Sequence, residues 1–367
     1  MARKLKSDKV LFLTTILLVG LSVVMVYSAS AAVAYEKYGT PSTFLIKQAM
    51  WSVLGLAILA VVMRIDYRTY REPAFIWTCV CVVAVALVLV LFRSPINSAR
   101  RWIGIGGIGI QPSELSKLTA IFFIAALLER RMHRIDDVKY ALLPIGIVVA
   151  CFVGLILLEP DFGTSMSLLL IAGVMVFAAG LNYRYILGVA LCAMPALYLL
   201  VMSTAYRRRR MLAFLHPWDD PLGDGFQVIQ SIIAVGTGGV TGKGFMAGVQ
   251  KLFYLPEAHT DFIYSVIAEE LGLIGTTAVL ICFCVVMWRG MRVASRAADP
   301  FGAFLALGLT VMVGLQAFIN ISVVLGLMPT KGIPLPFVSF GGSSMLINLV
   351  GMGILLNVSQ HVTSTEA

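Results

Sequence analysis

Residues 255–272 read LPEAHTDFIYSVIAEELG, and they place three carboxylates where a long apolar segment begins. Asp261 stands at the start of that segment, whereas Glu269 and Glu270 stand inside it. An acid at the centre of a bilayer-spanning helix costs roughly 2.5–3.5 kcal/mol on insertion scales, so acids in such helices are rare and mark candidate functional sites. The stretch therefore indicates a membrane helix with functional charge at its outer end.

The rest of the chain has the composition of a membrane protein. Of its 367 residues, 59% are hydrophobic and 13% are charged, which excludes a soluble globular domain. Segments long enough to cross about 30 Å of hydrocarbon recur along the whole chain. We expect an all-α polytopic integral membrane protein, a single transmembrane domain over residues 1–367, with ten spans near 10–32, 43–63, 74–92, 114–130, 141–158, 165–182, 184–202, 261–287, 302–325 and 343–360.

The distribution of basic residues orients these spans. Lys and Arg collect in cytoplasmic loops, which accounts for most of the net charge of +9 without a nucleic-acid partner. With an even number of spans, both termini are then cytoplasmic. The opposite face receives a large extracytoplasmic loop at 203–260, and its basic start, YRRRR, indicates an anionic partner. The basic loops include Lys9, Arg64, Arg68, Arg130, Arg131, Arg289 and Arg292.

Cysteines, histidines and glycines give no sign of a metal centre or a nucleotide site. All six cysteines fall in predicted spans and are interpreted as packing residues. The four histidines are scattered, so no metal-ligand cluster is predicted. The segment GTGGVTGKG at 236–244 lacks the spacing of a phosphate-binding loop. The sequence indicates no definite cofactor, and Mg²⁺ or Mn²⁺ bridging substrate phosphates stays open, because such ions need few protein ligands.

Two further segments on the expected outer face carry polar residues. In 97–117, NSARRWIGIGGIGIQPSELSK, the apolar stretch is too short to span, so we expect it either to lie at the membrane interface or to dip into the membrane and out again, with Trp102 at headgroup level. Glu114 and Lys117 follow on one helix face, either as a local ion pair or as the lining of a polar cavity. In 328–344, MPTKGIPLPFVSFGGSS, prolines and glycines exclude regular helix.

That irregular backbone is tolerated at membrane depth only where protein or a water-filled cavity covers it. Lys331 is its only cation, and the hydroxyls and free amides of Ser343 and Ser344 could bind an anion at the next helix start. A simple turn is the alternative interpretation. Asp261 likewise has two interpretations. It is either a functional carboxylate or a simple N-cap, because an aspartate stabilises the start of a helix.

On a regular helix Glu269 and Glu270 would lie about 80° and 180° from Asp261, so the three acids cannot cluster. We expect both glutamates to bond to neighbouring helices and Asp261 to face an outer cavity with His259 and Thr260. One carboxylate among cations fits glycosyl transfer from a polyprenyl pyrophosphate, because that leaving group needs cations and the acceptor hydroxyl needs one general base. The candidate substrate-binding residues are Arg101, Trp102, Glu114, Lys117, Arg207, Arg210, Lys251, His259, Thr260, Lys331, Ser343 and Ser344.

Over nearly its whole length the chain resembles the SEDS family (shape, elongation, division and sporulation). The matching segments are ARRWI with QPSELSK, EPDFGT, RRMLAFLHPWDDPLGDGFQVIQSIIAVGTGGVTGKG, QKLFYLPEAHTDFIYSVIAEELGLIG and PTKGIPLPFVSFGGSS. The resemblance implies a ten-span peptidoglycan glycosyltransferase of the bacterial cytoplasmic membrane. It implies lipid II and an undecaprenyl-pyrophosphate-linked glycan as substrates, and Asp261 as the catalytic carboxylate.

The resemblance also implies partners: a class B penicillin-binding protein as transpeptidase, and other divisome membrane proteins. QKLFYLPEAHTDF and LMPTKG resemble the division branch more than the elongation branch, which implies a role at the septum. An elongation-branch polymerase is the alternative within the family. A lipid II flippase and a non-catalytic scaffold are the alternatives outside this activity. The flippase is disfavoured because no inverted repeat is apparent, and the scaffold would not need Asp261.

Overall fold

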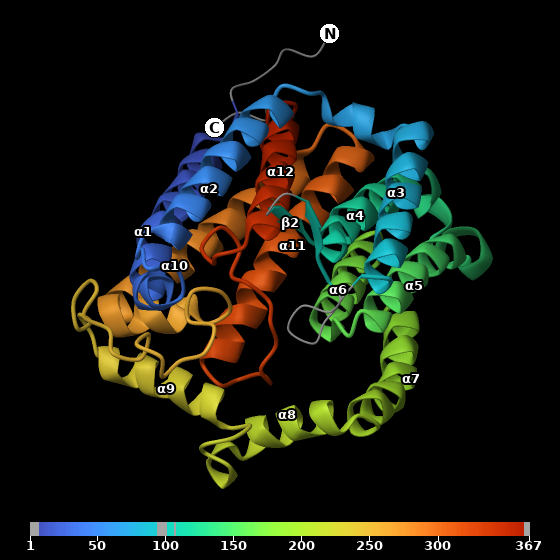
Figure 1. Cartoon of the computed structure of the whole chain (residues 1–367). Helices are drawn as coiled ribbons and strands as arrows, with labels where there is room; N and C mark the ends of the chain where they lie inside the picture. Colours follow the sequence, from blue (N-terminus) through green and yellow to red (C-terminus); the bar gives the residue numbers. More distant parts are fainter. Residues whose placement is uncertain (1–6, 94–100, 106–107, 363–367) are drawn as a thin grey trace.

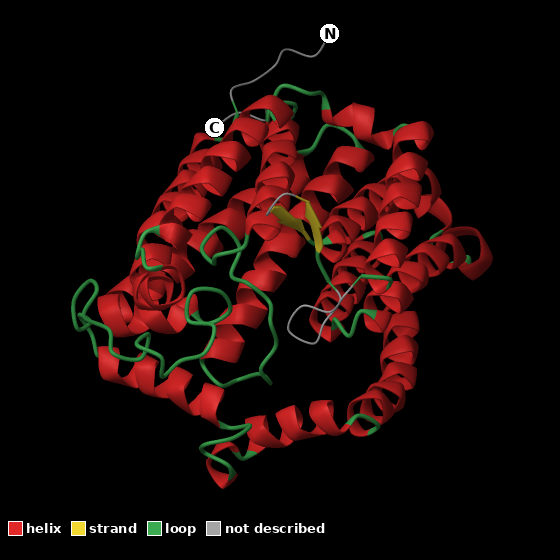
Figure 2. Cartoon of the chain, viewed as in Figure 1, coloured by secondary structure: helices red, strands yellow, loops and turns green. Residues whose placement is uncertain are grey.

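The computed structural model describes residues 7–93, 101–105 and 108–362, and there it is helical apart from one short hairpin (Figure 2). All ten predicted spans coincide with helices, which confirms the fold class. Seven of the described helices are long and apolar enough to cross a membrane by length and composition. The ten helices are α1 Lys9–Tyr38, α2 Thr43–Val62, α3 Pro73–Leu91, α4 Pro112–Arg131, α5 Leu143–Leu158, α6 Phe162–Ala178, α7 Tyr183–Met202, α10 Ile263–Arg296, α11 Pro300–Val324 and α12 Gly342–Ser359.

The centre of the bundle is formed by α11 and α12, whose apolar windows are 72% and 83% buried. Helix α11 packs against α10, α4 and α6, and α12 packs against α2. Figure 1 shows α1, α2 and α10 on one side of these two helices and α3 to α6 on the other. The central helices therefore bring side chains from both halves of the chain together.

Both ends of the described chain meet at one end of the bundle, as an even number of spans requires (Figure 1). Asp8, the N-cap of α1, donates its backbone N–H to Ser359 Oγ of α12 and accepts from the guanidinium of Arg289 at the far end of α10. The short helix η1 Tyr67–Arg71 lies at the same end, where Arg68 pairs with Asp299, the N-cap of α11. We call this the termini end.

The large loop predicted at 203–260 contains helices that its sequence did not predict. It holds α8 Ala205–Leu215, a turn of helix η4 at Pro217–Asp219 and α9 Phe226–Gly238. Figure 1 shows α7 and α8 running along the outside of the bundle before α9 returns to it. Helix α9 packs on α10, so the end of the loop is fixed against the helix that follows Asp261.

Helix α10 is broken at Gly272, which corrects the predicted span over 261–287. Gly272 has φ 64° and ψ −159°, a combination open essentially to glycine alone. The carbonyls left free before the break accept from loop amides: Lys243 N donates to Glu269 O, and Gly244 N donates to Glu270 O, both at 3.0 Å. The second part, 273–296, is about 36 Å long and can span the membrane by itself. Glu269 and Glu270 therefore precede the spanning part.

Part of the isoleucine-glycine stretch forms a β-hairpin, a structure that its sequence did not predict. Strand β1 Ile103–Ile105 pairs antiparallel with β2 Ile108–Ile110, with Ile103 opposite Ile110. Strand β2 packs against α12, and Figure 1 shows it beside the central helices. The Trp102 ring is 37% exposed and covers Gly109, where a Cβ would lie 3.1 Å from the ring.

Candidate functional site

Asp261 lies in the turn immediately before α10, in a loop that Figure 1 shows at the end of the bundle away from the termini. Backbone contacts fix that turn to the C-terminal third of the chain. The Asp261 carbonyl accepts from Asn320 Nδ2 at 2.7 Å, and the Thr260 carbonyl accepts from Ser339 Oγ at 2.5 Å. Because α11 and segment 328–341 hold this backbone, the carboxylate has a defined position although it is not in a helix.

The surroundings of Asp261 favour its neutral form. Burial raises the pKa of Asp261 to about 7, and the nearby Glu257 carboxylate acts in the same direction. The guanidinium groups of Arg210 and Arg101 oppose the rise, which shows that they are close enough to act on the carboxylate. A carboxylate that titrates near neutral pH is matched to the task of a general base.

Three cations approach the same region from different segments. Arg210 in the middle of α8 donates to the Thr330 carbonyl at 3.3 Å, and Arg101 before the hairpin donates to the Pro160 carbonyl at 2.7 Å. Lys331 Nζ lies 3.8 Å from the centre of the Phe162 ring. Burial lowers the pKa of Lys331 to about 8, although Asp161 favours its charged form.

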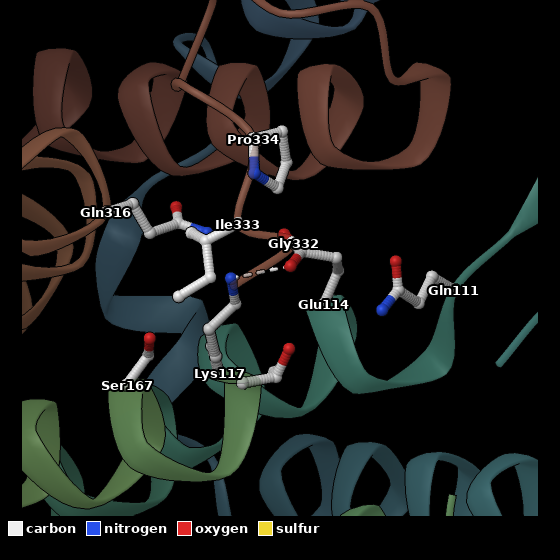
Figure 3. A pocket seen from close by; sticks show the side chains of 9 residues that line it. Gln111, Glu114, Lys117, Ser167, Gln316, Gly332, Ile333 and Pro334 are labelled. Carbon is white, nitrogen blue, oxygen red and sulfur yellow. Dashed lines mark hydrogen bonds and ion pairs between the residues drawn. The ribbon is translucent and has the colours of Figure 1, made fainter. Parts of the chain in front are cut away.

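Segment 328–341 passes close to the Asp261 carboxylate. A Cβ placed on Gly332 would lie 3.0 Å from Asp261 Oδ2, so glycine at this position lets the backbone approach. Gly332 and its neighbours Ile333 and Pro334 also line a small polar pocket with α4, α6 and α11 (Figure 3). One backbone segment therefore links Asp261 to the pocket.

Glu114 and Lys117 face each other in this pocket, as Figure 3 shows. Lys117 Nζ donates to Glu114 Oε1 at 2.7 Å, and the two residues are 1% and 3% exposed. The two residues therefore form the local ion pair and also line a cavity, so both interpretations describe part of the arrangement. Glu114 Oε2 and Gln316 Oε1 are buried without a hydrogen-bond partner. Both oxygens line a pocket in which they could accept from a bound hydroxyl.

The EPDFGT turn between α5 and α6 contributes two acids, Glu159 and Asp161, that were not among the predicted site residues. Asp161, the N-cap of α6, accepts from Gln111 Nε2 at 3.1 Å and from Thr164 Oγ1 at 2.8 Å. Glu159 is fully buried with both carboxylate oxygens unpartnered, and burial raises its pKa to about 8. Gln111, Gln316 and Asn320 are also near the site, and no pattern in the sequence predicted a functional role for these three amides.

Lys251 was predicted to bind substrate, but in the structure it is buried and bonded to other residues of the protein. Lys251 Nζ bonds to Glu270 Oε1 at 2.6 Å and to Ser28 Oγ at 2.8 Å, and Lys251 is 5% exposed. Glu270 thus reaches the neighbouring helix α1 through Ser28, as expected. Glu269 instead pairs with Lys243 of the glycine-rich loop at 2.7 Å. Neither glutamate joins Asp261, which confirms that the three acids do not cluster.

His259, Thr260, Ser343 and Ser344 are not among the residues that line the polar pocket. The His259 ring packs between Phe44 and Phe340, with centroid distances of 4.7 and 5.7 Å, and burial lowers its pKa. Thr260 Oγ1 donates to Glu257 Oε2 at 2.8 Å. Ser343 and Ser344 begin α12 as predicted and are buried, and Ser344 Oγ accepts from Asn348 of the same helix. The side chain of Arg207 lies outside the described part of the structure.

The described residues contain no group of three or more His, Cys, Asp or Glu side chains arranged to hold a metal ion. The carboxylates found near the pocket are each engaged with a cation, an amide or a hydroxyl, or are buried alone. A divalent ion would therefore need ligands from a bound substrate, and its presence stays a prediction.

Comparison with known proteins gives matches along nearly the whole chain. The family described as "Cell cycle protein" (FtsW/RodA/SpoVE) matches residues 8–364. A Geobacter sulfurreducens protein named "Probable peptidoglycan glycosyltransferase FtsW" is 45% identical over 97% of this chain and 95% of its own length. "Stage V sporulation protein E" of Bacillus subtilis is 40% identical over 98% of both chains.

Solved structures share the fold. A chain described under "Structural coordination of polymerization and crosslinking by a peptidoglycan synthase complex" superposes with a TM-score of 0.78 at 32% identity, covering 96% of this chain and 97% of the other. The rod shape determining protein RodA of Thermus thermophilus superposes with a TM-score of 0.71 at 28% identity, over 96% of each chain.

Proposed function

This chain belongs to the SEDS (FtsW/RodA/SpoVE) family and is a multi-pass membrane peptidoglycan glycosyltransferase of cell division, and we propose that Asp261 is the general base of its reaction. The observation that carries the proposal is the setting of Asp261. A half-buried carboxylate, whose pKa is raised to about 7, lies beside a polar pocket and close to two guanidinium groups that act on its charge. A base poised near the operating pH gives the best balance between ionisation and proton affinity.

The substrate that fits this arrangement is lipid II. Asp261 takes the proton from the GlcNAc 4-hydroxyl of an incoming lipid II as that oxygen bonds to the anomeric carbon of the growing chain's lipid-linked MurNAc. The bond from that carbon to the pyrophosphate oxygen breaks with inversion, and undecaprenyl pyrophosphate leaves with the bonding electrons. A pyrophosphate needs no proton in order to leave, so one carboxylate is sufficient.

Arg101, Arg210 and Lys331 are the cations that would stabilise the leaving pyrophosphate. Each belongs to a different segment, and each is tied near the site by a carbonyl or a ring: Pro160, Thr330 or Phe162. Fixed cations stabilise charge that develops in a transition state without reorganising during the reaction. The half-buried, partly desolvated position of Lys331 would make its charge more effective towards phosphate than that of an exposed lysine.

The pocket around Glu114 and Lys117 would bind a sugar of one substrate. Its lining combines a buried ion pair with the two unpartnered oxygens Glu114 Oε2 and Gln316 Oε1, which can accept from sugar hydroxyls. A buried acceptor without a partner costs free energy in the free enzyme, and a bound hydroxyl would recover that cost. Should Mg²⁺ or Mn²⁺ take part, phosphate oxygens of the substrate would be its main ligands.

A transpeptidase partner is proposed as well. The similar chain of known structure comes from a peptidoglycan synthase complex that couples polymerisation to crosslinking. We expect this chain to pair with a class B penicillin-binding protein and with other divisome membrane proteins at the division septum of the cytoplasmic membrane. A fluorescent fusion in the native host should concentrate at midcell during constriction. A signal spread along the sidewall throughout the cycle would instead favour an elongation role.

The experiment that tests the proposed function is a polymerisation assay. The purified chain, in complex with its transpeptidase partner, is given labelled lipid II, and glycan strands are resolved on a gel. We expect strands from the wild-type chain and almost none from an Asp261→Asn chain that still binds the partner. Equal strand synthesis by the two proteins would remove Asp261 from the chemistry.

A further inference from the structure

Asn320 of α11 uses one amide group to join the two irregular segments that carry the site. Its Nδ2 donates to the Asp261 carbonyl at 2.7 Å and to the Ile333 carbonyl at 2.8 Å. The residue is 2% exposed, and it comes from one of the most buried helices of the bundle. A primary amide has two N–H donors, and here each donor has its own carbonyl.

The two carbonyls belong to segments without a regular hydrogen-bond ladder of their own. The loop before α10 contains residues in the left-handed region, among them Glu257 with φ 54°, and segment 328–341 contains Phe337 with φ 62°. Their positions relative to each other therefore depend on side-chain bonds such as those of Asn320. At the point where they meet, a Cβ on Gly332 would lie only 3.0 Å from Asp261 Oδ2.

We propose that Asn320 is a positioning residue for glycosyl transfer, because it sets the separation between the Asp261 carboxylate and the segment that carries Lys331. This inference rests on the proposed role of Asp261 as the base. Asn320 itself does not need to touch substrate. Its two bonds hold the base and the cation segment in one geometry, and a displacement of about 1 Å in such a geometry can reduce a rate by about 10²-fold.

Other bonds hold the neighbourhood, so a change at Asn320 should loosen Asp261 without unfolding its loop. Ser339 Oγ donates to the Thr260 carbonyl, and Phe340 N donates to the His259 carbonyl at 3.0 Å. These bonds fix the two residues before Asp261. Of the described side chains, only that of Asn320 donates to the carbonyl of Asp261 itself.

The chain offers a matched control in Asn357 of α12. Asn357 is fully buried, its Nδ2 donates to the Met63 carbonyl at 2.8 Å, and its Oδ1 accepts from Tyr67 N at 2.9 Å. It therefore also joins separate segments through one amide, but at the termini end of the bundle. Asn357→Ala should cost stability for the same physical reasons as Asn320→Ala and should leave the site in place.

The test compares Asn320→Ala, Asn320→Asp, Asn357→Ala and Asp261→Asn in the full chain bound to its transpeptidase partner. Thermal unfolding and initial rates of lipid II polymerisation over substrate concentration and pH are measured for each. We expect both Asn320 variants to lose about 10²-fold in kcat with KM nearly unchanged. The acidic limb of their pH profile should move to lower pH, because a loosened loop admits water to Asp261. Asn357→Ala should lower Tm comparably and keep kcat.

Asn320→Asp removes both N–H donors and keeps the shape of the side chain. If the buried carboxylate prevents this variant from folding, Asn320→Ala provides the same comparison. A kcat within twofold of wild type in a folded Asn320 variant would overturn the inference. The inference would also be overturned if Asn357→Ala lost as much kcat as the Asn320 variants at the same Tm. If Asp261→Asn is inactive while the Asn320 variants are active, the positioning role alone fails. If Asp261→Asn polymerises normally, the proposed base fails with it.

Discussion

Lys251 Nζ lies 2.6 Å from Glu270 Oε1 in an ion pair that is almost entirely shielded from solvent. The pair joins the loop before Asp261 to the end of the first part of α10. Ser28 of α1 bonds to both partners: its Oγ accepts from Lys251 Nζ and donates to Glu270 Oε1. This explains how Glu270 can lie in an apolar segment, because its charge is compensated within the protein. Its role is to shape the loop, and the substrate does not need to reach it.

The buried pair predicts a stability effect that depends on which partner is removed. Lys251→Met leaves Glu270 buried and unpaired, and breaking a buried pair in this way typically costs about 3–5 kcal/mol. The double change Lys251→Met with Glu270→Leu should recover much of that loss, since no lone charge remains. Thermal unfolding in detergent of the two variants checks this. Equal Tm values for the single variant and the wild type would contradict the buried pair.

Gly272 predicts a second stability effect. Gly272→Ala should strongly destabilise the protein, because φ 64° with ψ −159° excludes an L side chain and a Cβ would lie 2.3 Å from Gly242 N. Gly154→Ala, within α5, is the matched control. A Cβ there meets nothing within 4 Å, and alanine favours a helix over glycine by about 1 kcal/mol. Comparable Tm values for the two variants would show that α10 is continuous.

Glu114 and Lys117 should act as a unit in polymerisation. Glu114→Gln or Lys117→Met alone breaks the 2.7 Å ion pair and leaves a charge buried in the pocket, so each should lose most activity. The double variant should lose much less than the product of the two single effects, because residues in direct contact couple. Initial rates with labelled lipid II measure all three variants. Strictly multiplicative effects would mean that the two residues act independently.

The pH profile of polymerisation should be bell-shaped. Asp261 works as a base only when it is ionised, so the rate should fall as pH drops below about 7, the raised pKa of this carboxyl. Lys331 assists only when protonated, so the rate should also fall as pH rises above about 8. Lys331→Arg should abolish the alkaline limb with partial activity, since a guanidinium stays charged, and Lys331→Ala should lose most activity. An unchanged alkaline limb in Lys331→Arg would exclude Lys331 as its origin.

Hydropathy and charge were sufficient to predict the helices of this fold, because a bilayer leaves a chain few alternatives. All ten helices lie within a few residues of the predicted segments, apart from longer ends on α1 and α10. The break in α10 was not predictable in the same way. Gly272 in an apolar run is compatible with a continuous helix, and only the contact with the backbone of 240–244 shows why the chain turns there.

The candidate site was predictable where charge stands out against an apolar background. Asp261, Glu114, Lys117 and Lys331 were selected on this ground, and their roles stay predictions. Asn320 and Gln316 were not, because a single amide in an apolar helix gives no sign of what it faces. Lys251 shows the opposite error: its charge was visible in the sequence, but its partner Glu270 was not assigned to it, and the pairing makes the lysine structural.

The central claim is that the Asp261 carboxylate removes the acceptor proton, and Asp261→Asn tests it most directly. Asparagine keeps the shape of the side chain but cannot accept that proton. The N-cap of α10 is Phe262, so the change removes no helix cap. In the complex with the transpeptidase partner, we expect wild-type partner binding and a loss of about 10²–10⁴-fold in the rate of lipid II polymerisation. A folded, partner-bound Asp261→Asn protein that makes glycan strands at nearly the wild-type rate would contradict the account.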